Sequence, residues 1–227
     1  MTTTLITGGN RGLGFETARQ LVQLGHTVFI GARDEVKGRQ AAEKLGAQFV
    51  QLDVTQDASV AAAAKKLGSL DVLINNAGIS GPMLPTLEIT PEALRTVYET
   101  NVVGVMRMIR AMRPLLEKSA CPVIVNVGSG LGSNSVVLDE ARIESKVPAV
   151  AYASSKSALT MLTVQYALAL PGMRVNVVDP GYTATDFNHH RGHQTVEEGA
   201  EIIVNMATID QRGPTASFRN RHGTVGW

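Results

Sequence analysis

Tyr152 and Lys156 have the residue types and the spacing that acid–base chemistry needs. They stand four residues apart in the segment YASSK, so that on a helix their side chains share one face. A free tyrosine ionises at about pH 10 and is a weak acid–base catalyst at neutral pH. A neighbouring ammonium group favours the phenolate and lowers that pKa. Tyr152 is therefore a candidate proton donor to a carbonyl group, or proton acceptor from an alcohol.

A tyrosine–lysine pair at this spacing also occurs on exposed helices, so the interpretation depends on other polar segments. Asn75–Gly78 follows one apolar run, Ser129 follows a second, and Asp179–Thr185 follows a third. Asn101 lies within a stretch of helical spacing, where asparagine is locally unfavourable. Open parallel sheets bind ligands beyond the carboxyl ends of their strands. The sequence therefore places these segments at one edge of a sheet, around a common site.

A glycine-rich turn, Thr7–Gly14 (TGGNRGLG), joins the first apolar run to the first helical stretch. Glycines adopt backbone angles closed to other residues and let a pyrophosphate approach the main chain. The helix that follows offers unpaired N–H groups and the positive end of its dipole. The spacing G-x3-G-x-G differs from the more widespread G-x-G-x-x-G, and a tight turn without a ligand can have the same composition. Its place at the start of a repeating α/β pattern favours a dinucleotide site.

Two arginines indicate which dinucleotide is bound. Arg11 lies inside the glycine turn, and Arg33 follows the second apolar run. An acidic residue at the end of the second strand binds the adenosine ribose hydroxyls, whereas an arginine there favours a 2′-phosphate. We therefore predict NADP(H) as the preferred cofactor. NAD(H) stays open as the alternative, because Asp34 is only one residue further on.

Short apolar runs alternate with helical stretches along the chain. The runs are rich in β-branched residues and apolar on both faces, and they are Thr3–Thr7, Thr27–Ala32, Gln48–Val54, Asp71–Ala77, Pro122–Val127 and Arg174–Asp179. This alternation builds a doubly wound parallel sheet with right-handed crossovers and helices on both faces. No linker or low-complexity tract interrupts it. We predict one α/β domain over residues 1–227 that both binds the dinucleotide and carries the catalytic residues.

The chain after the last apolar run is expected to cover the ligand-binding edge. Residues 189–193 read HHRGH, Thr195 to about Thr208 has helical spacing, and Gly213–Trp227 is rich in Gly, Arg and Asn. We predict a short substrate lid over about residues 186–208 and an irregular structure after it. The adjacent histidines lack an accompanying set of acids or cysteines, so no native metal site is expected.

The composition excludes several classes of protein. The 227 residues include 21 Lys and Arg against 20 Asp and Glu, which argues against a binder of nucleic acid or of membrane surfaces. A hydrophobic fraction of 44% and a charged fraction of 18% exclude bulk disorder. The single cysteine, Cys121, excludes an intramolecular disulfide and a cysteine-based zinc cluster. No apolar run spans a bilayer and the first residues do not read as a signal peptide, which predicts a cytoplasmic protein.

In combination, these motifs resemble the short-chain dehydrogenase/reductase family over about Thr3 to Thr185. The segments GARD at 31–34 and QLDV at 51–54 are most similar to its carbonyl-reductase branch. The resemblance implies a Rossmann-type sheet of about seven parallel strands. It implies NAD(P)-dependent interconversion of a carbonyl and an alcohol on a small molecule, without metal. It also implies a homo-oligomer, a dimer or tetramer, joined through the apolar stretches Val97–Leu116 and Ala158–Leu170.

The resemblance transfers catalytic roles to four residues. Tyr152 would be the general acid/base, and Lys156 would lower its pKa and bind the nicotinamide ribose hydroxyls. Ser129 would hydrogen-bond the substrate oxygen where negative charge develops. Asn101 would hold a water that extends the proton relay behind Lys156.

It also transfers cofactor contacts. Asp53 and Val54 would flank the adenine, and Asn76 would sit near the adenosine ribose. The full set implied as cofactor-binding is Gly8, Asn10, Arg11, Gly12, Leu13, Gly14, Arg33, Asp53, Val54, Asn76, Ala77, Gly78, Tyr152, Lys156, Pro180, Gly181, Thr183 and Thr185.

The sequence departs from the family pattern in one place that affects function, and two other functions stay open. The gap between Ser129 and Tyr152 is longer than usual, and its polar extra residues, within 134–149, are expected to be exposed at the rim of the site or over a dimerisation helix.

One alternative is a non-catalytic NAD(P)-sensing regulator on the same fold, a class that usually loses the tyrosine or the lysine. The other is a reductase of a carrier-bound acyl group, with Arg191 and Arg219 as docking candidates.

Overall fold

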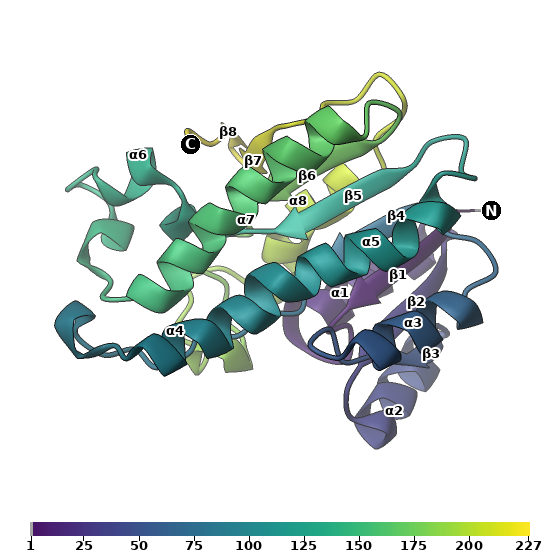
Figure 1. The fold of residues 1–227 in the computed structure, drawn as a ribbon, viewed down its shortest axis with the longest axis horizontal. Helices are drawn as coiled ribbons and strands as arrows, with labels where there is room; N and C mark the ends of the chain where they lie inside the picture. The colour runs from purple at the N-terminus through teal and green to yellow at the C-terminus, as the bar shows by residue number, and fades with distance from the viewer. Residues whose placement is uncertain (1) are drawn as a thin grey trace.

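One sheet of eight strands, in the order β3-β2-β1-β4-β5-β6-β7-β8, forms the centre of the computed structural model, which describes residues 2–227 (Figure 1). Every neighbouring pair from β3 to β7 is parallel, and β8 runs antiparallel to β7. The strands are β1 (Thr3–Thr7), β2 (Thr27–Ala32), β3 (Gln48–Gln51), β4 (Val72–Asn75), β5 (Val123–Val127), β6 (Arg174–Val178), β7 (Phe218–Asn220) and β8 (Gly223–Thr224). The predicted doubly wound parallel sheet is confirmed.

Helices cover both faces of the sheet (Figure 1), because neighbouring residues of a strand point to opposite faces. On one face Ile6 packs in a core with Leu21 and Ile203; on the other, Leu5 packs in a core with Met108 and Leu159. The first face carries α1 (Gly12–Gln23), α2 (Glu35–Leu45) and α8 (Val196–Ala207), and the second carries α3 (Asp57–Lys66), α5 (Gly104–Leu116) and α7 (Val150–Ala169). The short helices α4 (Pro91–Tyr98) and α6 (Asn134–Val137) lie toward the carboxyl ends of the strands.

The strand order reverses between β1 and β4. The chain moves outward from β1 to β2 and β3, and then returns to pair β4 with the other side of β1. Such a reversal leaves a crevice beyond the carboxyl ends of the two strands, where open α/β sheets bind ligands. The glycine turn after β1 and the residues Asn76–Gly78 after β4 therefore lie on either side of this crevice.

The last residues of the chain differ from the prediction, which expected them to be irregular. They form the hairpin of β7 and β8, and Phe218 is fully buried in a small core with Val177, Val225 and Val136. The hairpin escaped the sequence pattern because β7 has three residues and only Phe218 among them is apolar.

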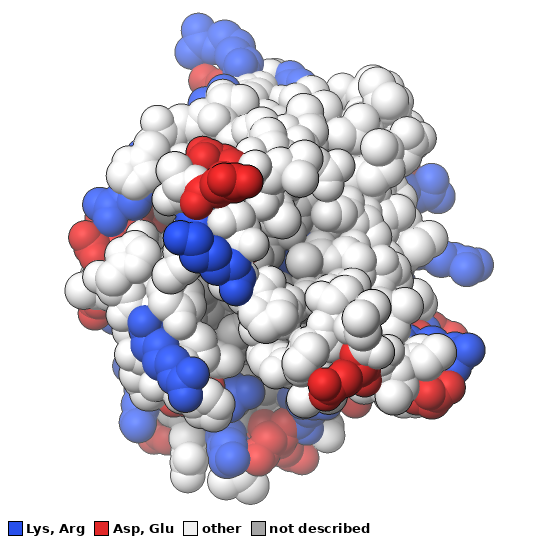
Figure 2. Space-filling model, turned by 90° about the vertical axis from the view of Figure 1, so that its left-hand side faces the viewer, with Lys and Arg blue, Asp and Glu red and all other residues white. Residues whose placement is uncertain are grey.

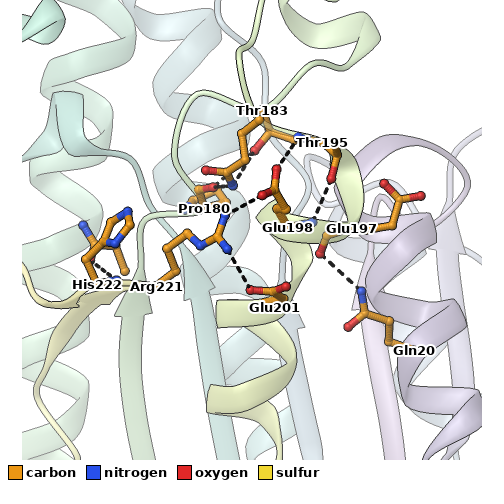
Figure 3. Close-up of polar contacts among 11 residues, drawn as sticks. Gln20, Pro180, Thr183, Thr195, Glu197, Glu198, Glu201, Arg221 and His222 are labelled. Carbon is orange, nitrogen blue, oxygen red and sulfur yellow. Dashed lines mark hydrogen bonds and ion pairs between the residues drawn. The ribbon is translucent and has the colours of Figure 1, made fainter.

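The helix predicted after Thr195 is confirmed as α8, but it is a core element. Ala200 and Ile203 are fully buried, and α8 packs against α1 and β5. In Figure 3, Arg221 in the turn between β7 and β8 pairs with Glu198 at 3.0 Å and with Glu201 at 3.5 Å. The helix is thus fixed on both sides, and within the predicted lid range residues 186–195 precede it and Thr208 follows it.

Within residues 2–227, no helix combines the length and the apolar character that crossing a bilayer requires.

Candidate active site

A cleft of about 740 Å³ opens at the carboxyl edge of the sheet. Figure 2 shows this face: charged side chains, several of them Lys or Arg, gather along one side of the hollow, and a wide uncharged surface adjoins the other. Asn101 is the one residue of the predicted site that does not line the cleft. The lining includes all the others, namely Gly8, Asn10, Arg11, Gly12, Leu13, Gly14, Arg33, Asp53, Val54, Asn76, Ala77, Gly78, Ser129, Tyr152, Lys156, Pro180, Gly181, Thr183 and Thr185.

The glycine turn is a close-packed piece of main chain. Gly8 and Gly12 have φ angles of 67° and 53°, which side chains with a Cβ rarely adopt. A methyl group on Gly14 would lie 2.5 Å from the Gly8 carbonyl oxygen. The Asn76 amide fixes the turn from the side, since its Nδ2 donates to the Thr7 oxygen at 2.8 Å and to the Gly8 oxygen at 3.2 Å.

The start of α1 fits an anion. Among residues 2–227, no side chain caps this helix, because the N-cap residue Arg11 makes no such hydrogen bond. The first N–H groups of α1 therefore face the cleft beside Gly12, Leu13 and Gly14, which all line it. A pyrophosphate is bound by main-chain N–H groups that it can approach closely, and the glycines here leave these groups uncovered. These residues therefore fit a dinucleotide.

Arg33 and Asp34 are neighbours in sequence, but only Arg33 lines the cleft. Arg33 is exposed and lines the cleft. The Asp34 carboxylate caps α2 instead, accepting the Lys37 N–H at 3.0 Å. Arg11 forms an exposed ion pair with Asp186 at 3.9 Å, so the glycine turn contacts the segment 186–194 across the cleft.

Ser129, Tyr152 and Lys156 meet at the other end. Lys156 is 5% exposed, its Nζ donates to the Val127 oxygen at 2.7 Å, and the same Nζ lies 5.5 Å from the centre of the Tyr152 ring. The Ser129 hydroxyl accepts the Leu131 N–H at 3.2 Å. A hydroxyl that accepts at its oxygen still has its own hydrogen to donate, and the Ser129 side chain is close enough to Tyr152 to lower the pKa of its phenol.

The structure corrects the predicted pKa of Tyr152. Removal of water around the phenol raises its pKa above the ordinary value, the Ser129 hydrogen bond lowers it, and the Asp179 charge raises it further. Burial also lowers the pKa of Lys156 to about 8. The neighbouring ammonium group favours the phenolate, but the loss of water around the phenol is the larger effect. Tyr152 is consequently protonated at neutral pH, the state that a proton donor needs.

The Asn101 side chain joins three segments of the protein by hydrogen bonds. It lies in a π-helical turn, Glu99–Val103, between α4 and α5, and it is 1% exposed. Its Oδ1 accepts the Ile79 N–H at 2.9 Å, and its Nδ2 donates to the Ile79 oxygen at 2.9 Å and to the Ser155 hydroxyl at 3.0 Å. The side chain thus joins the helix to the loop after β4 and to α7 behind Tyr152.

Sequence reasoning missed the residues that surround the substrate end. The polar insert is mostly exposed, as expected, yet Ile143, Glu144 and Val147 within it line the cleft. The Phe187 ring lies 5.6 Å from the Tyr152 ring. These residues carry no characteristic spacing, so only the fold brings them together. Asp179 was also missed as a site residue, although its place beside Pro180 offered a signal.

The histidine-rich segment forms no metal centre among residues 2–227, where no group of three or more His, Cys, Asp or Glu side chains could hold a metal ion. His189 and His190 have positive φ angles of 55° and 57°. The His190 ring lies 3.0 Å from the Asp186 carboxylate, both of them exposed.

Comparison with known proteins agrees with this geometry. The family profile described as "short chain dehydrogenase" matches residues 2–196. A (+)-neomenthol dehydrogenase of Capsicum annuum is 32% identical, over 94% of this chain and 94% of the relative. The solved structure of salutaridine reductase from Papaver somniferum is 30% identical with a TM-score of 0.81, over 96% of this chain and 99% of that one. That of NADPH-bound carbonyl reductase from chicken fatty liver is 26% identical with a TM-score of 0.87, over 100% and 99%. The chain therefore belongs to the short-chain dehydrogenase/reductase family, and it is an oxidoreductase that acts on alcohol and carbonyl groups.

Proposed function

We propose that the protein is an NADP(H)-dependent reductase of organic carbonyl compounds, with Tyr152 as the proton donor. The observation that carries the proposal is the arrangement of one cleft. Ser129, Tyr152 and Lys156 line one end of it, the glycine turn lines its middle, and Arg33 lines the far end. Proton donor, anion cradle and cation are thus spaced along a single binding site.

The preference for NADP(H) is supported by the different environments of two neighbouring residues. Arg33 lines the cleft. In the described part of the chain, the Asp34 carboxylate is hydrogen-bonded to the Lys37 N–H at the start of α2 and forms no ion pair with Arg33. A guanidinium recognises a phosphate through charge-assisted hydrogen bonds. The similar carbonyl reductase from chicken fatty liver binds NADPH, in agreement with this assignment.

In the proposed mechanism, NADPH supplies the hydride when it is bound. The Ser129 hydroxyl donates to the carbonyl oxygen of the substrate, where negative charge develops. The Tyr152 phenol, protonated at neutral pH, gives its proton to the same oxygen. Lys156 holds a positive charge beside the ring and stabilises the phenolate that remains. Its Val127 contact fixes the position of Nζ.

The walls near Tyr152 favour an apolar substrate. The Phe187 ring lies beside Tyr152, and the apolar side chains that line the cleft also include Met83, Leu131, Ile143 and Val147. Asp186, Phe187, Asn188, His189 and Arg191 line the same cleft, so the lid is proposed for the shorter segment 186–194 and not for α8. Similar proteins are named for the monoterpenoid neomenthol and for salutaridine. We therefore propose a bulky, mainly apolar ketone or aldehyde as the substrate class.

A homo-oligomer remains our proposal as well. Exposed apolar side chains support it: Met161 is 60% exposed and Leu168 is 70% exposed on α7, and Met106 is 42% exposed on α5. Light scattering coupled to gel filtration measures the mass directly. A species of 24.1 kDa at micromolar concentration would refute this proposal.

The function is tested with purified protein and a panel of aliphatic, cyclic and aromatic ketones and aldehydes. NADPH consumption is followed by absorbance, with NADH in parallel reactions and a carrier-mimicking thioester of a 3-oxoacyl group as a separate arm. We expect turnover of apolar cyclic ketones with NADPH and a tighter dissociation constant for NADPH than for NADH. Equal affinities would refute the cofactor assignment, and turnover of the thioester alone would refute the substrate class.

A further inference from the structure

We propose that Asp179 is a positioning residue that fastens the loop carrying Ser129 to the Pro180–Gly181 loop. This inference rests on the proposed function, because it concerns where the Ser129 hydroxyl stands during carbonyl reduction. Asp179 is the first residue after β6 and is only 6% exposed. It also lines the cleft that contains Tyr152. A carboxylate is rarely buried to this degree unless its oxygens are engaged.

The oxygens of Asp179 engage two different loops. Oδ1 accepts the Gly181 N–H of its own loop at 3.0 Å. The carboxylate also faces the Gly130 backbone, in the loop after β5, and this contact lowers the pKa of Asp179. Its Oδ2 lies so close to Gly130 that a methyl group there would approach it to 3.2 Å. Gly130 directly follows Ser129, so this contact acts one residue away from the hydroxyl donor.

The Pro180–Gly181 loop has a second support that does not involve Asp179. Gln194 donates from Nε2 to the Pro180 oxygen at 2.7 Å, and its main chain pairs with Tyr182 at 3.3 Å and with Ala184 at 2.9 Å. Figure 3 shows this loop, with Pro180 and Thr183 labelled, beside the capped start of α8. On the other side of Ser129, the Gly128 N–H donates to the Val178 oxygen at 2.7 Å, so the Asp179 contact concerns the Gly130 side of the serine. Without the carboxylate, the Pro180–Gly181 loop keeps its hydrogen bond from Gln194, whereas Ser129 loses the contact beside it at Gly130. We therefore expect Ser129 to be displaced more than the Pro180–Gly181 loop.

A carboxylate is the side chain that this position requires. It offers two acceptor oxygens, one for each backbone N–H, whereas an asparagine offers one oxygen and an NH₂ group that would face a donor. The titratable groups that act on it are Glu144 and Arg142 on the insert, and the neutral phenol of Tyr152 on α7 feels its charge. Burial raises the pKa of Asp179, and the amides of Gly181 and Gly130 lower it.

The experiment compares Asp179→Asn with Asp71→Asn in the full-length protein. Asp71 is a matched control, because its carboxylate also accepts a backbone N–H, that of Thr3 at 2.7 Å, at the opposite edge of the sheet. We expect Asp179→Asn to lower kcat about 10- to 100-fold, in the range for loss of an oriented oxyanion donor, with the NADPH dissociation constant changed less than about threefold. Asp71→Asn should lower the melting temperature and leave kcat at the temperature of the assay unchanged.

A double-mutant cycle with Ser129→Ala separates positioning from general damage. If Asp179 acts through Ser129, Asp179→Asn should cost less than about threefold in kcat once Ser129 is already alanine, because residues that act as one unit are not additive. Full additivity of the two losses would overturn the proposal. A rise in the NADPH dissociation constant as large as the fall in kcat would overturn it too.

The outcome is distinguishable from failure of the proposed function. If Tyr152→Phe keeps full activity, the mechanism itself is wrong. If Tyr152→Phe is inactive and Asp179→Asn is fully active, only the Asp179 proposal fails. Should Asp179→Asn not fold, Asp179→Ser supplies the same comparison, since its shorter side chain reaches one amide at most, and a Ser variant with native kcat overturns the proposal.

Discussion

The glycine turn and the Tyr152 end of the cleft are built from different parts of the polypeptide. At the glycine turn, the groups that we propose to bind the cofactor are main-chain N–H groups at the start of α1, and the Asn76 amide supports the turn. At the Tyr152 end, the groups are side chains from β5, α7, the insert and the segment after β6. The first end is fixed by local backbone conformation. The second depends on elements far apart in sequence.

This difference predicts how each end responds to substitution. A main-chain site is insensitive to most side-chain changes but sensitive to any added atom at a glycine. A side-chain site loses its chemistry with one functional group while its shape survives. Four variants test this contrast: two lie at the Tyr152 end, one lies in the glycine turn, and one is at Arg33, a side chain beyond the main-chain cradle.

At the side-chain end, Tyr152→Phe should have the largest effect. The variant keeps the ring and its contact with Phe187 but removes the proton donor, so kcat for carbonyl reduction should fall about 10²–10⁴-fold. The NADPH dissociation constant, measured by fluorescence titration, should stay within about threefold. Tyr166→Phe is the matched control, because Tyr166 stands on the same helix α7 and does not line the cleft. A Tyr152→Phe enzyme with native kcat would show that the proton comes from elsewhere.

Lys156→Met tests how much stability the buried ammonium costs. Burial lowers the pKa of Lys156 from 10.5 to about 8, so between these values the unfolded chain binds the proton and the folded chain does not. Stability therefore rises with pH across this window, and it is reduced at pH values below 8. Against Lys156→Met, the free energy of unfolding of the unmodified protein should gain roughly 3 kcal/mol between pH 8 and pH 10.5. Urea titrations across this range measure the difference.

The opposite slope, a loss of relative stability above pH 8, would mean that the folded protein holds the proton more tightly than the unfolded chain. Lys156→Met should also be inactive as a reductase at every pH in the series. Below pH 8, the Lys156→Met variant is thus expected to be more stable than the unmodified protein and to have lost its activity.

At the main-chain end, Gly14→Ala should weaken both cofactors alike. The added methyl group would lie 2.5 Å from the Gly8 oxygen and 2.5 Å from Asn76 Nδ2, and such overpacking costs about 1–3 kcal/mol. The dissociation constants for NADPH and NADH should both rise about 10- to 100-fold. Gly68→Ala is the control, since a methyl group there meets nothing within 4 Å. A Gly14→Ala protein with native affinity would contradict a main-chain cradle.

Arg33→Ala should have the smallest and most selective effect. Loss of a charge-assisted contact to a phosphate costs about 1.5–3 kcal/mol, so NADPH binding should weaken about tenfold or slightly more. NADH binding should change little. Arg95→Ala removes a similarly exposed arginine that does not line the cleft and serves as control. Equal weakening of both cofactors would exclude Arg33 as the residue that distinguishes them.

The same contrast explains what the sequence could predict. The glycine turn and the starts of the central strands were recognisable, because backbone requirements leave glycines and β-branched runs in the sequence. The strand ends were less clear: the run Gln48–Val54 was predicted as one strand, but β3 ends at Gln51. Leu52 and Val54 are buried and apolar, as in a strand, yet they lie in the loop that lines the cleft.

Side-chain arrangements were harder to predict. The direction of the Tyr152 pKa depends on how much water the fold removes, and the sequence does not contain that quantity. The predicted lid covers about residues 186–208 and our proposal covers only 186–194, because helical spacing between Thr195 and Thr208 does not say whether a helix packs on the core. Ile143, Val147 and Phe187 reach the cleft only through the path of the chain after β5 and β6.

The π-helical turn at Glu99–Val103 affects which neighbours the two halves of one long helix contact. An extra residue in a single turn rotates everything after it by about 100° about the helix axis. With this change of phase, α4 directs its contacts to α7, and α5 directs its own to α3 and β4. Deleting one residue from the turn would restore an uninterrupted α-helix and improve its local hydrogen bonding. It would also swing the buried face of one half toward solvent, so the regular helix would be the less stable protein.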